Sequence, residues 1–297
     1  MNNFDTIIDT ICKVACIKIT YLSDNWIKVL EKDGQVRYIE GYKFDLNNHG
    51  VGNIIDDKGL FYDICKLKNL PIIEHYVIFK DYDKDSVIKY FHKNHNEIVI
   101  KGNIGTCGKE VYKVNNEKDL FNIINELFKS QYSISLCPYY QIKNEYRTIY
   151  LNKELRIIYG KERPLIIGDG IHTIGELAIK YNAYFKDNKP ENNDLIPKKG
   201  EKILLNFQFN LSKGARMFFD IDNNLEERIK SLSKEVINKL DLKFVSIDII
   251  HTIDDKLLIM EANSGIMMDN YIRFNPDKID EVINLYTDAI LLMFNKR

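Results

Sequence analysis

The sequence is poor in the features that mark secreted, zinc-binding and membrane proteins. Its five cysteines are odd in number and scattered without a CxxC pair, so neither a disulfide framework nor a zinc site is indicated: Cys12, Cys16, Cys65, Cys107 and Cys137. No run approaches the ~18 consecutive apolar residues of a membrane span. Asp5 and Asp9 stand where a signal peptide would be basic and then apolar. We therefore expect a protein of the reducing cytoplasm with no membrane partner.

The chain also lacks an excess of charge of either sign. Its 42 lysines and arginines against 43 aspartates and glutamates give a formal net charge of −1. No nucleic-acid partner is indicated, and any charge that binds phosphate must be local. With 297 residues, 45% of them hydrophobic, the chain is long enough to bury a sizeable core in one large domain or in a few small lobes.

Helical and extended patterns alternate along the chain. Apolar residues recur at helical spacing over residues 4–16, and two strand-like runs, 26–31 and 35–39, flank Asp33-Gly34, a strong hairpin turn signal. Further helices and antiparallel hairpins follow. This mixture predicts the α/β class in an α+β arrangement, with residues 1–57 as a small N-terminal lobe.

Three oxygen-bearing side chains fall on one predicted hairpin. Asp248 lies inside an apolar strand, and Glu261 and Asn263 end the next strand, after a turn at Asp254-Asp255. Glu261 and Asn263 are two residues apart and so share a face, where they can meet Asp248 across the hairpin. Two carboxylates and an amide oxygen are hard ligands that suit Mg²⁺ held together with phosphates. The alternative is a cross-strand pair of solvated acids, but a carboxylate among isoleucines is costly unless it is compensated.

A second pattern is a lysine followed by a glycine-rich loop. The strand that ends at Lys101 leads into residues 102–109, which include Gly105, Thr106 and Gly108. Glycines let backbone N–H groups close over phosphates, and the lysine adds a point charge. A strand follows the loop where a Walker A motif or a dinucleotide fingerprint would need a helix. Taken alone, the loop is equally consistent with a simple turn.

The order of these patterns resembles the ATP-grasp superfamily, and in particular the ATP-grasp modules of cyanophycin synthetase and bifunctional glutathione synthetase. D-alanine–D-alanine ligases are more distantly similar. The similarity covers residues 36 to 270 and is carried by the following motifs: Asp57-Lys58, Lys101-Gly102, Glu145-Tyr146-Arg147, Gly168-Asp169-Gly170, Asn210-Leu211-Ser212, and the set Asp248, Glu261 and Asn263.

The resemblance implies an ATP-grasp fold, in which ATP lies between two α+β lobes. Residues 58–140 would form the small lid subdomain, and residues 141–297 the large subdomain with the metal site. The resemblance further assigns Lys58, Lys101 and the glycine loop to the ATP phosphates. The hinge would read adenine through Cys137, Tyr139 and Tyr140, and Glu145 would contact the ribose.

For catalysis, the resemblance implies that Lys101 and Arg147 act on the transferring phosphoryl group. Arg216 would hold either that group or a substrate carboxylate, and its alternative is a plain surface position. A planar guanidinium suits that role because it can pair with phosphate oxygens. Each residue has an ordinary alternative. Lys58 can be a surface lysine, Lys101 a strand-end lysine whose stem packs on apolar surface, and Arg147 a salt-bridged arginine of a sheet. Tyr139 and Tyr140 can be plain core aromatics.

The activity implied is that of an ATP-dependent carboxylate–amine ligase that forms an amide bond through an acyl phosphate. It would use ATP and Mg²⁺, or Mn²⁺ in its place, on small-molecule or peptide carboxylates and amines. Many relatives are homodimers, and the sequence leaves both a monomer and a homodimer open for this chain. Three alternatives stay open at this point. The chain can be a nucleotide-binding regulatory or assembly module without turnover, a ligase that modifies a dedicated peptide or protein partner, or a phosphotransferase.

Overall fold

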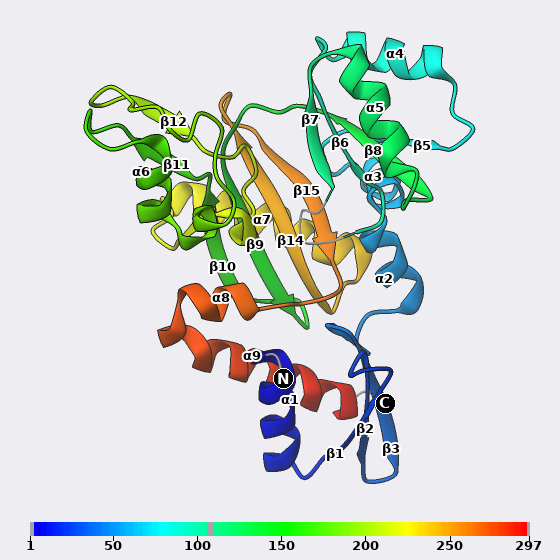
Figure 1. The fold of residues 1–297 in the computed structure, drawn as a ribbon. Coiled ribbons are helices and arrows are strands. Elements are labelled where there is room, and N and C mark those ends of the chain that lie inside the picture. The colour runs from blue at the N-terminus through cyan, green and yellow to red at the C-terminus, as the bar shows by residue number, and fades with distance from the viewer. Residues whose placement is uncertain (1–2, 106–109, 296–297) are drawn as a thin grey trace.

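The computed structural model describes residues 3–105 and 110–295. The chain begins with a helix and a four-stranded antiparallel sheet of order β1-β2-β3-β4: α1 (Asn3–Val14), β1 (Lys18–Leu22), β2 (Ile27–Lys32), β3 (Gln35–Glu40) and β4 (Lys43–Phe44). Asp33 and Gly34 join β2 to β3 with positive φ angles of 49° and 75°, as the predicted hairpin turn requires. The C-terminal helix α9 (Ile279–Asn295) packs beside α1, so the two ends of the chain meet in one layer (Figure 1).

Two short helices lead out of this layer. α2 (His49–Asp56) and α3 (Lys58–Leu67) are separated by Asp57, whose carboxylate caps α3 by accepting a hydrogen bond from the Leu60 backbone N–H at 2.9 Å. This cap sets the direction of the first turn of α3. Lys58, the first residue of that turn, is thereby brought beside the small sheet that follows.

The small sheet has the order β5-β8-β6-β7 and is antiparallel throughout. Two helices pack on it, and their apolar residues form a separate core with Ile98, Ile100 and Ile134. The elements of this part are β5 (Tyr76–Phe79), α4 (Lys84–Lys93), β6 (Ile98–Gly102), β7 (Val111–Val114), α5 (Glu117–Leu127) and β8 (Ser133–Pro138).

The large sheet is the centre of the molecule and has the order β13-β10-β9-β14-β15. Its strands are β9 (Ile142–Leu151), β10 (Glu154–Glu162), β13 (Arg216–Phe218), β14 (Phe244–Thr252) and β15 (Leu257–Asn263). α7 (Asn223–Leu240) packs against it with the apolar side chains of a second core, while other residues of β9 and β10 join the core of the N-terminal layer. Every residue of β14 is buried, so a charged group on that strand must have partners inside the protein.

A projecting segment lies between β10 and β13 (Figure 1). It contains β11 (Leu165–Ile167), α6 (Ile174–Tyr181), η1 (Ala183–Lys186), β12 (Lys202–Leu204) and η2 (Leu211–Lys213), and β11 pairs with β12. Residues 187–201 hold no helix or strand, in keeping with the loop-like composition of that stretch. After β15 come α8 (Asp269–Phe274) and η3 (Pro276–Lys278). None of the helices in the described part of the chain is long and apolar enough to cross a membrane. The α+β arrangement predicted from the sequence is confirmed.

Candidate active site

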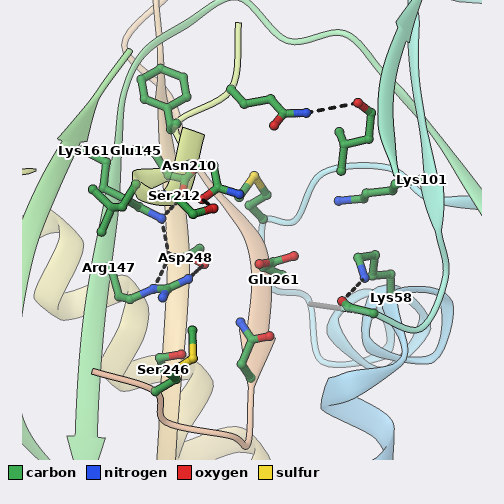
Figure 2. A pocket seen from close by; sticks show the side chains of 18 of the residues that line it. Lys58, Lys101, Glu145, Arg147, Lys161, Asn210, Ser212, Ser246, Asp248 and Glu261 are labelled. Atoms are coloured by element: carbon green, nitrogen blue, oxygen red, sulfur yellow. Dashed lines mark hydrogen bonds and ion pairs between the residues drawn. The ribbon is translucent and has the colours of Figure 1, made fainter. Parts of the chain in front are cut away.

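A cleft of about 850 Å³ lies where the large sheet, the small sheet and the N-terminal sheet meet. Its walls bring together the predicted metal residues, both phosphate lysines and the hinge. Figure 2 shows part of this set. Asp248, Glu261 and Arg147 project from the large sheet, and Lys58 and Lys101 approach from the opposite wall.

One wall carries four alternating charges on three neighbouring strands. Arg147 on β9 lies directly opposite Asp248 on β14, and Glu145 lies opposite Lys161 on β10. The Arg147 guanidinium donates from Nε to Oδ1 of Asp248 at 2.8 Å and from a terminal nitrogen to Oδ2 at 2.5 Å. The Lys161 ammonium donates to the same Oδ1 at 3.1 Å and forms an ion pair with Glu145. Arg147 is therefore salt-bridged in the sheet, but it also lines the cleft.

Burial and pairing set the charges of these groups. Burial by itself would raise the pKa of Asp248, but Arg147 and Lys161 outweigh it and hold the pKa of that carboxyl well below its usual range. Glu145 differs because burial is the dominant influence there. Its pKa is raised to about 7, with Lys161 opposing the shift and Asp248 adding to it. Asp248 is therefore a fixed anion near neutral pH, whereas Glu145 gains or loses a proton there.

This shift makes stability depend on pH. The pKa of Glu145 is higher in the folded protein (about 7) than its ordinary value of 4.5, so folding takes up a proton between these values. The stabilising contribution is complete below pH 4.5 and is lost as the pH rises through 7, a change of roughly 3 kcal/mol. In urea unfolding, the unfolding free energy of the wild type should fall between about pH 5 and about pH 8. The Glu145→Gln variant should lack the part of this fall that comes from Glu145. An identical pH profile in both proteins would contradict the assignment.

The predicted metal residues lie together at the end of the β14–β15 hairpin. Asp248 is paired with Glu261, and Ser246 with Asn263, in the register of the two strands. Within residues 3–105 and 110–295, the side chains of Glu261 and Asn263 make no hydrogen bond or ion pair, and both line the cleft.

These donors fit a hard divalent cation held jointly with a ligand. A carboxylate offers about four acceptor positions, and Arg147 and Lys161 use three of those on Asp248. Among the described residues, no group of three or more His, Cys, Asp or Glu side chains gathers as a self-sufficient metal site. Glu261 and Asn263 supply free oxygens and Asp248 supplies one remaining position. That set suits Mg²⁺, which keeps several waters or phosphate oxygens in its coordination shell.

The opposite wall carries two buried lysines. Lys58 is 8% exposed, and its Nζ donates to the backbone carbonyls of Asn103 at 3.2 Å and Gly105 at 3.1 Å, which ties it to the start of the glycine loop. Burial lowers its pKa; Glu261 opposes that shift and Lys101 adds to it. Lys101 is 7% exposed, and in the described part of the chain its ammonium has no hydrogen-bond or ion-pair partner. A buried cation of this kind calls for an anion from outside the chain.

The hinge residues form the far end of the cleft. Cys137, Tyr139 and Tyr140 all line it, and the Lys113 ammonium lies 3.7 Å from the ring centroid of Tyr139. The Tyr140 hydroxyl accepts a hydrogen bond from the Glu74 backbone N–H at 3.2 Å. Cys137 is buried, and burial raises the pKa of its thiol, so it suits a wall residue better than a nucleophile.

A glutamine bridges the two lobes beside the hinge. Gln208 follows Phe207, whose ring contacts that of Tyr139, and its Nε2 donates to the Val111 carbonyl of β7 at 3.0 Å. Its Oε1 is buried and accepts no hydrogen bond from the described residues. An unpaired buried acceptor at this position is satisfied when a ligand donates a hydrogen bond to it.

Some residues that the sequence assigned to the site lie elsewhere or have other partners in the structure. Arg216 lies outside the cleft, on the edge strand β13, where its guanidinium stacks 3.6 Å from the Tyr181 ring centroid and donates to the Tyr181 carbonyl. Glu145 lies in the cleft with its carboxylate paired to Lys161, and its contact with the ribose stays a prediction. Gly105 lines the cleft, whereas Thr106 and Gly108 fall outside the described residues.

Two residues of the site were missed in the sequence. Lys161 is 5% exposed and contacts both Asp248 and Glu145. Its signal was a lysine directly after the uncharged run of residues 157–160, a position where a charge needs partners. Gln208 had no comparable signal, because its role depends on the approach of β7 from the other lobe.

The comparisons with known proteins agree with this architecture. No protein-family model matches the chain, and no curated protein matches its sequence. Among solved structures, a bifunctional glutathione synthetase from Pasteurella multocida is similar over 90% of this chain and 41% of its own, with a TM-score of 0.52 and 16% identity. A D-alanine–D-alanine ligase from Bacillus anthracis is similar over 73% of this chain and 60% of its own (TM-score 0.52, 14% identity).

A third similar structure is the ATP-grasp ligase PsnB in complex with a phosphomimetic variant of its minimal precursor, Mg and ADP. It matches 82% of this chain and 60% of its own, with a TM-score of 0.51 and 13% identity. The chain thus spans less than two thirds of each of these proteins. At such identities the likeness concerns the fold.

Proposed function

Because the chain has the ATP-grasp fold, we propose that it is an ATP-dependent ligase that joins a carboxylate to an amine through an acyl phosphate. One observation carries the proposal. Two buried lysines, Lys58 and Lys101, face the unengaged oxygens of Glu261 and Asn263 across one cleft, so cations for phosphates and ligands for a dication converge on the same space.

In this proposal each wall has a distinct task. Lys58 and Lys101 bind the phosphates of ATP, and the hinge at Cys137–Tyr140 holds the base, with the Oε1 of Gln208 as an acceptor for a donor on the ligand. Arg147 and Lys161, already fixed by Asp248, stabilise the charge that develops as the γ-phosphoryl group passes to the substrate carboxylate. Cations held in advance cost little reorganisation when that charge appears.

Glu261, Asn263 and the remaining position on Asp248 are the residues that would hold Mg²⁺, or Mn²⁺ in its place. A bound dication would neutralise phosphate charge and orient the triphosphate. The amine then attacks the acyl carbon, and phosphate leaves. No protein nucleophile is required, because positioning and charge neutralisation supply the catalysis.

The test is ADP release from Mg-ATP with a pool of amino acids and short peptides, followed by mass spectrometry of the products. The control is the Asp248→Ala, Glu261→Ala double variant. We expect a product whose mass equals acid plus amine minus water, and no product with the variant. A phosphorylated product that does not react further would favour a phosphotransferase. ATP binding without turnover on any pool member would favour a dedicated partner or a regulatory module.

Removing the lysine charges should weaken ATP binding. Lys58→Met and Lys101→Met each keep the length and apolar stem of the side chain but remove a charge-assisted hydrogen bond to phosphate. We expect each to raise the Kd for Mg-ATP about 10- to 100-fold, measured by isothermal titration calorimetry. Lys66→Met is the matched control, because Lys66 is exposed on the same helix as Lys58. Equal affinities in all four proteins would exclude these lysines as phosphate ligands.

A further inference from the structure

A second cavity, of about 350 Å³, lies beside the cleft between the end of α6, η1, β13 and α8. Two arginines line it, and none of its lining residues in the described part of the chain is acidic. The residues that matter are Arg216, Arg273, Tyr181, Phe274, Asn182 and Asn275. Arg216 lies in this cavity, away from Lys58 and Lys101.

Both arginines are exposed, and no carboxylate among the described residues forms an ion pair with either of them. Arg216 stacks on Tyr181 and donates one hydrogen bond, at 2.6 Å, to the Tyr181 carbonyl, which leaves its other N–H groups for a ligand. Arg273 lies 5.5 Å from the Phe274 ring centroid. In the described ranges neither arginine forms an ion pair; Glu162, the cross-strand neighbour of Arg216, is exposed and forms none either.

One face of α8 connects this cavity to the cleft. Asn270 of α8 lines the cleft, while Arg273 and Phe274 line the second cavity. Residues three and four apart lie on the same helix face, about 5 Å apart along the axis. A ligand that lies against Asn270 therefore reaches the arginines by continuing one helical turn along the same surface.

We propose that the arginine cavity is a subsite for a carboxylate of an extended acidic substrate, a peptide with Asp or Glu side chains, whose reacting end lies in the cleft. The guanidinium fork matches a carboxylate in two-bond geometry. An extended chain spans about 3.5 Å per residue, so an acidic side chain one to three residues away covers the distance along α8. This inference rests on the proposed function, which it deepens by naming the substrate class.

The test is direct binding of fluorescein-labelled tetraglutamate, followed by fluorescence anisotropy. We expect the wild type to bind tetraglutamate but not tetraglutamine, and the Arg216→Gln, Arg273→Gln variant to bind tetraglutamate at least about tenfold more weakly. The control is Arg228→Gln, which removes an exposed arginine that is paired with Asp255. Equal binding by the double variant and the wild type, or no binding by the wild type, would overturn the proposal.

Two further measurements test the carboxylate assignment and the folding of the variant. Unlabelled glutarate and inorganic phosphate are each added as competitors of tetraglutamate. Displacement of tetraglutamate by phosphate at lower concentrations than by glutarate would overturn the carboxylate assignment. Mg-ATP binding by the double variant serves as the check on folding. If the wild type binds tetraglutamate through the arginines but does not bind ATP, the ligase function fails while the anion site is supported.

Discussion

Asp248→Asn is expected to reduce ADP formation at least about a hundredfold and to lower stability by about 3–5 kcal/mol. Asp248 is 1% exposed and accepts three hydrogen bonds, from Arg147 and Lys161. Asparagine keeps the shape but removes the charge, so Glu145 is the one carboxylate left beside the buried Lys161 and the partly buried Arg147 in the described part of this wall. Breaking a buried ion pair from one side is costly because the other charge stays buried.

Urea denaturation measures the stability change, and ADP release with the acid and amine that the pool assay identifies measures the activity. The matched control is Asp254→Asn on the turn of the same hairpin. Asp254 is exposed and pairs with Lys256, so both quantities should stay unchanged. If Asp248→Asn has the same unfolding free energy as the wild type, the pairing of Asp248 with Arg147 and Lys161 does not stabilise the fold.

Lys161→Met is expected to lower kcat by about 10²–10³ with a smaller effect on the Kd for ATP. Lys161 reaches the cleft between Glu145 and Asp248, on the large sheet and away from the phosphate lysines. Its charge is therefore placed to act on the group in transfer. Single-turnover kinetics separate this loss from the loss of ATP binding expected for Lys58→Met and Lys101→Met.

A double-mutant cycle distinguishes a catalytic charge from a structural one. Glu145→Gln removes the partner of Lys161 and leaves the lysine with Asp248. If Lys161 acts on the substrate, kcat of the Glu145→Gln, Lys161→Met protein should match that of Lys161→Met alone, because both groups work as one unit. Recovery of kcat in the double variant would instead indicate that Lys161 only neutralises Glu145.

The parts of the site that were predicted from the sequence are those fixed by local geometry. The turn at Asp254-Asp255 sets the hairpin that brings Asp248 near Glu261 and Asn263, although a β-bulge after Ile259 shifts the register by one residue and so places Glu261 directly opposite Asp248. The Asp33-Gly34 turn and the cap at Asp57 are similarly local. These features need no knowledge of how distant segments meet.

The remaining features depend on long-range order. The four charged side chains on β9, β10 and β14 meet because β9 lies between the other two strands, an arrangement that no local pattern specifies. α2 was not predicted because Gly50 and Gly52 are poor helix formers; it forms through the Asn48 cap and the burial of Ile55. The assignment of Arg216 to the phosphoryl group or to a substrate carboxylate came from the resemblance alone, and the edge strand β13 carries this residue into a cavity separate from the cleft.

The central claim is that ATP and a carboxylate react in the cleft to give an acyl phosphate. Substrate acids labelled with ¹⁸O in the carboxylate test it most directly, with Mg-ATP and the amine pool, by mass spectrometry of the phosphate released. The account predicts one ¹⁸O atom in each phosphate, because the attacking carboxylate oxygen leaves with the phosphoryl group when the amine displaces it. Phosphate formed at the same rate without label would mean that water or another acceptor takes the phosphoryl group, and it would contradict the ligase mechanism.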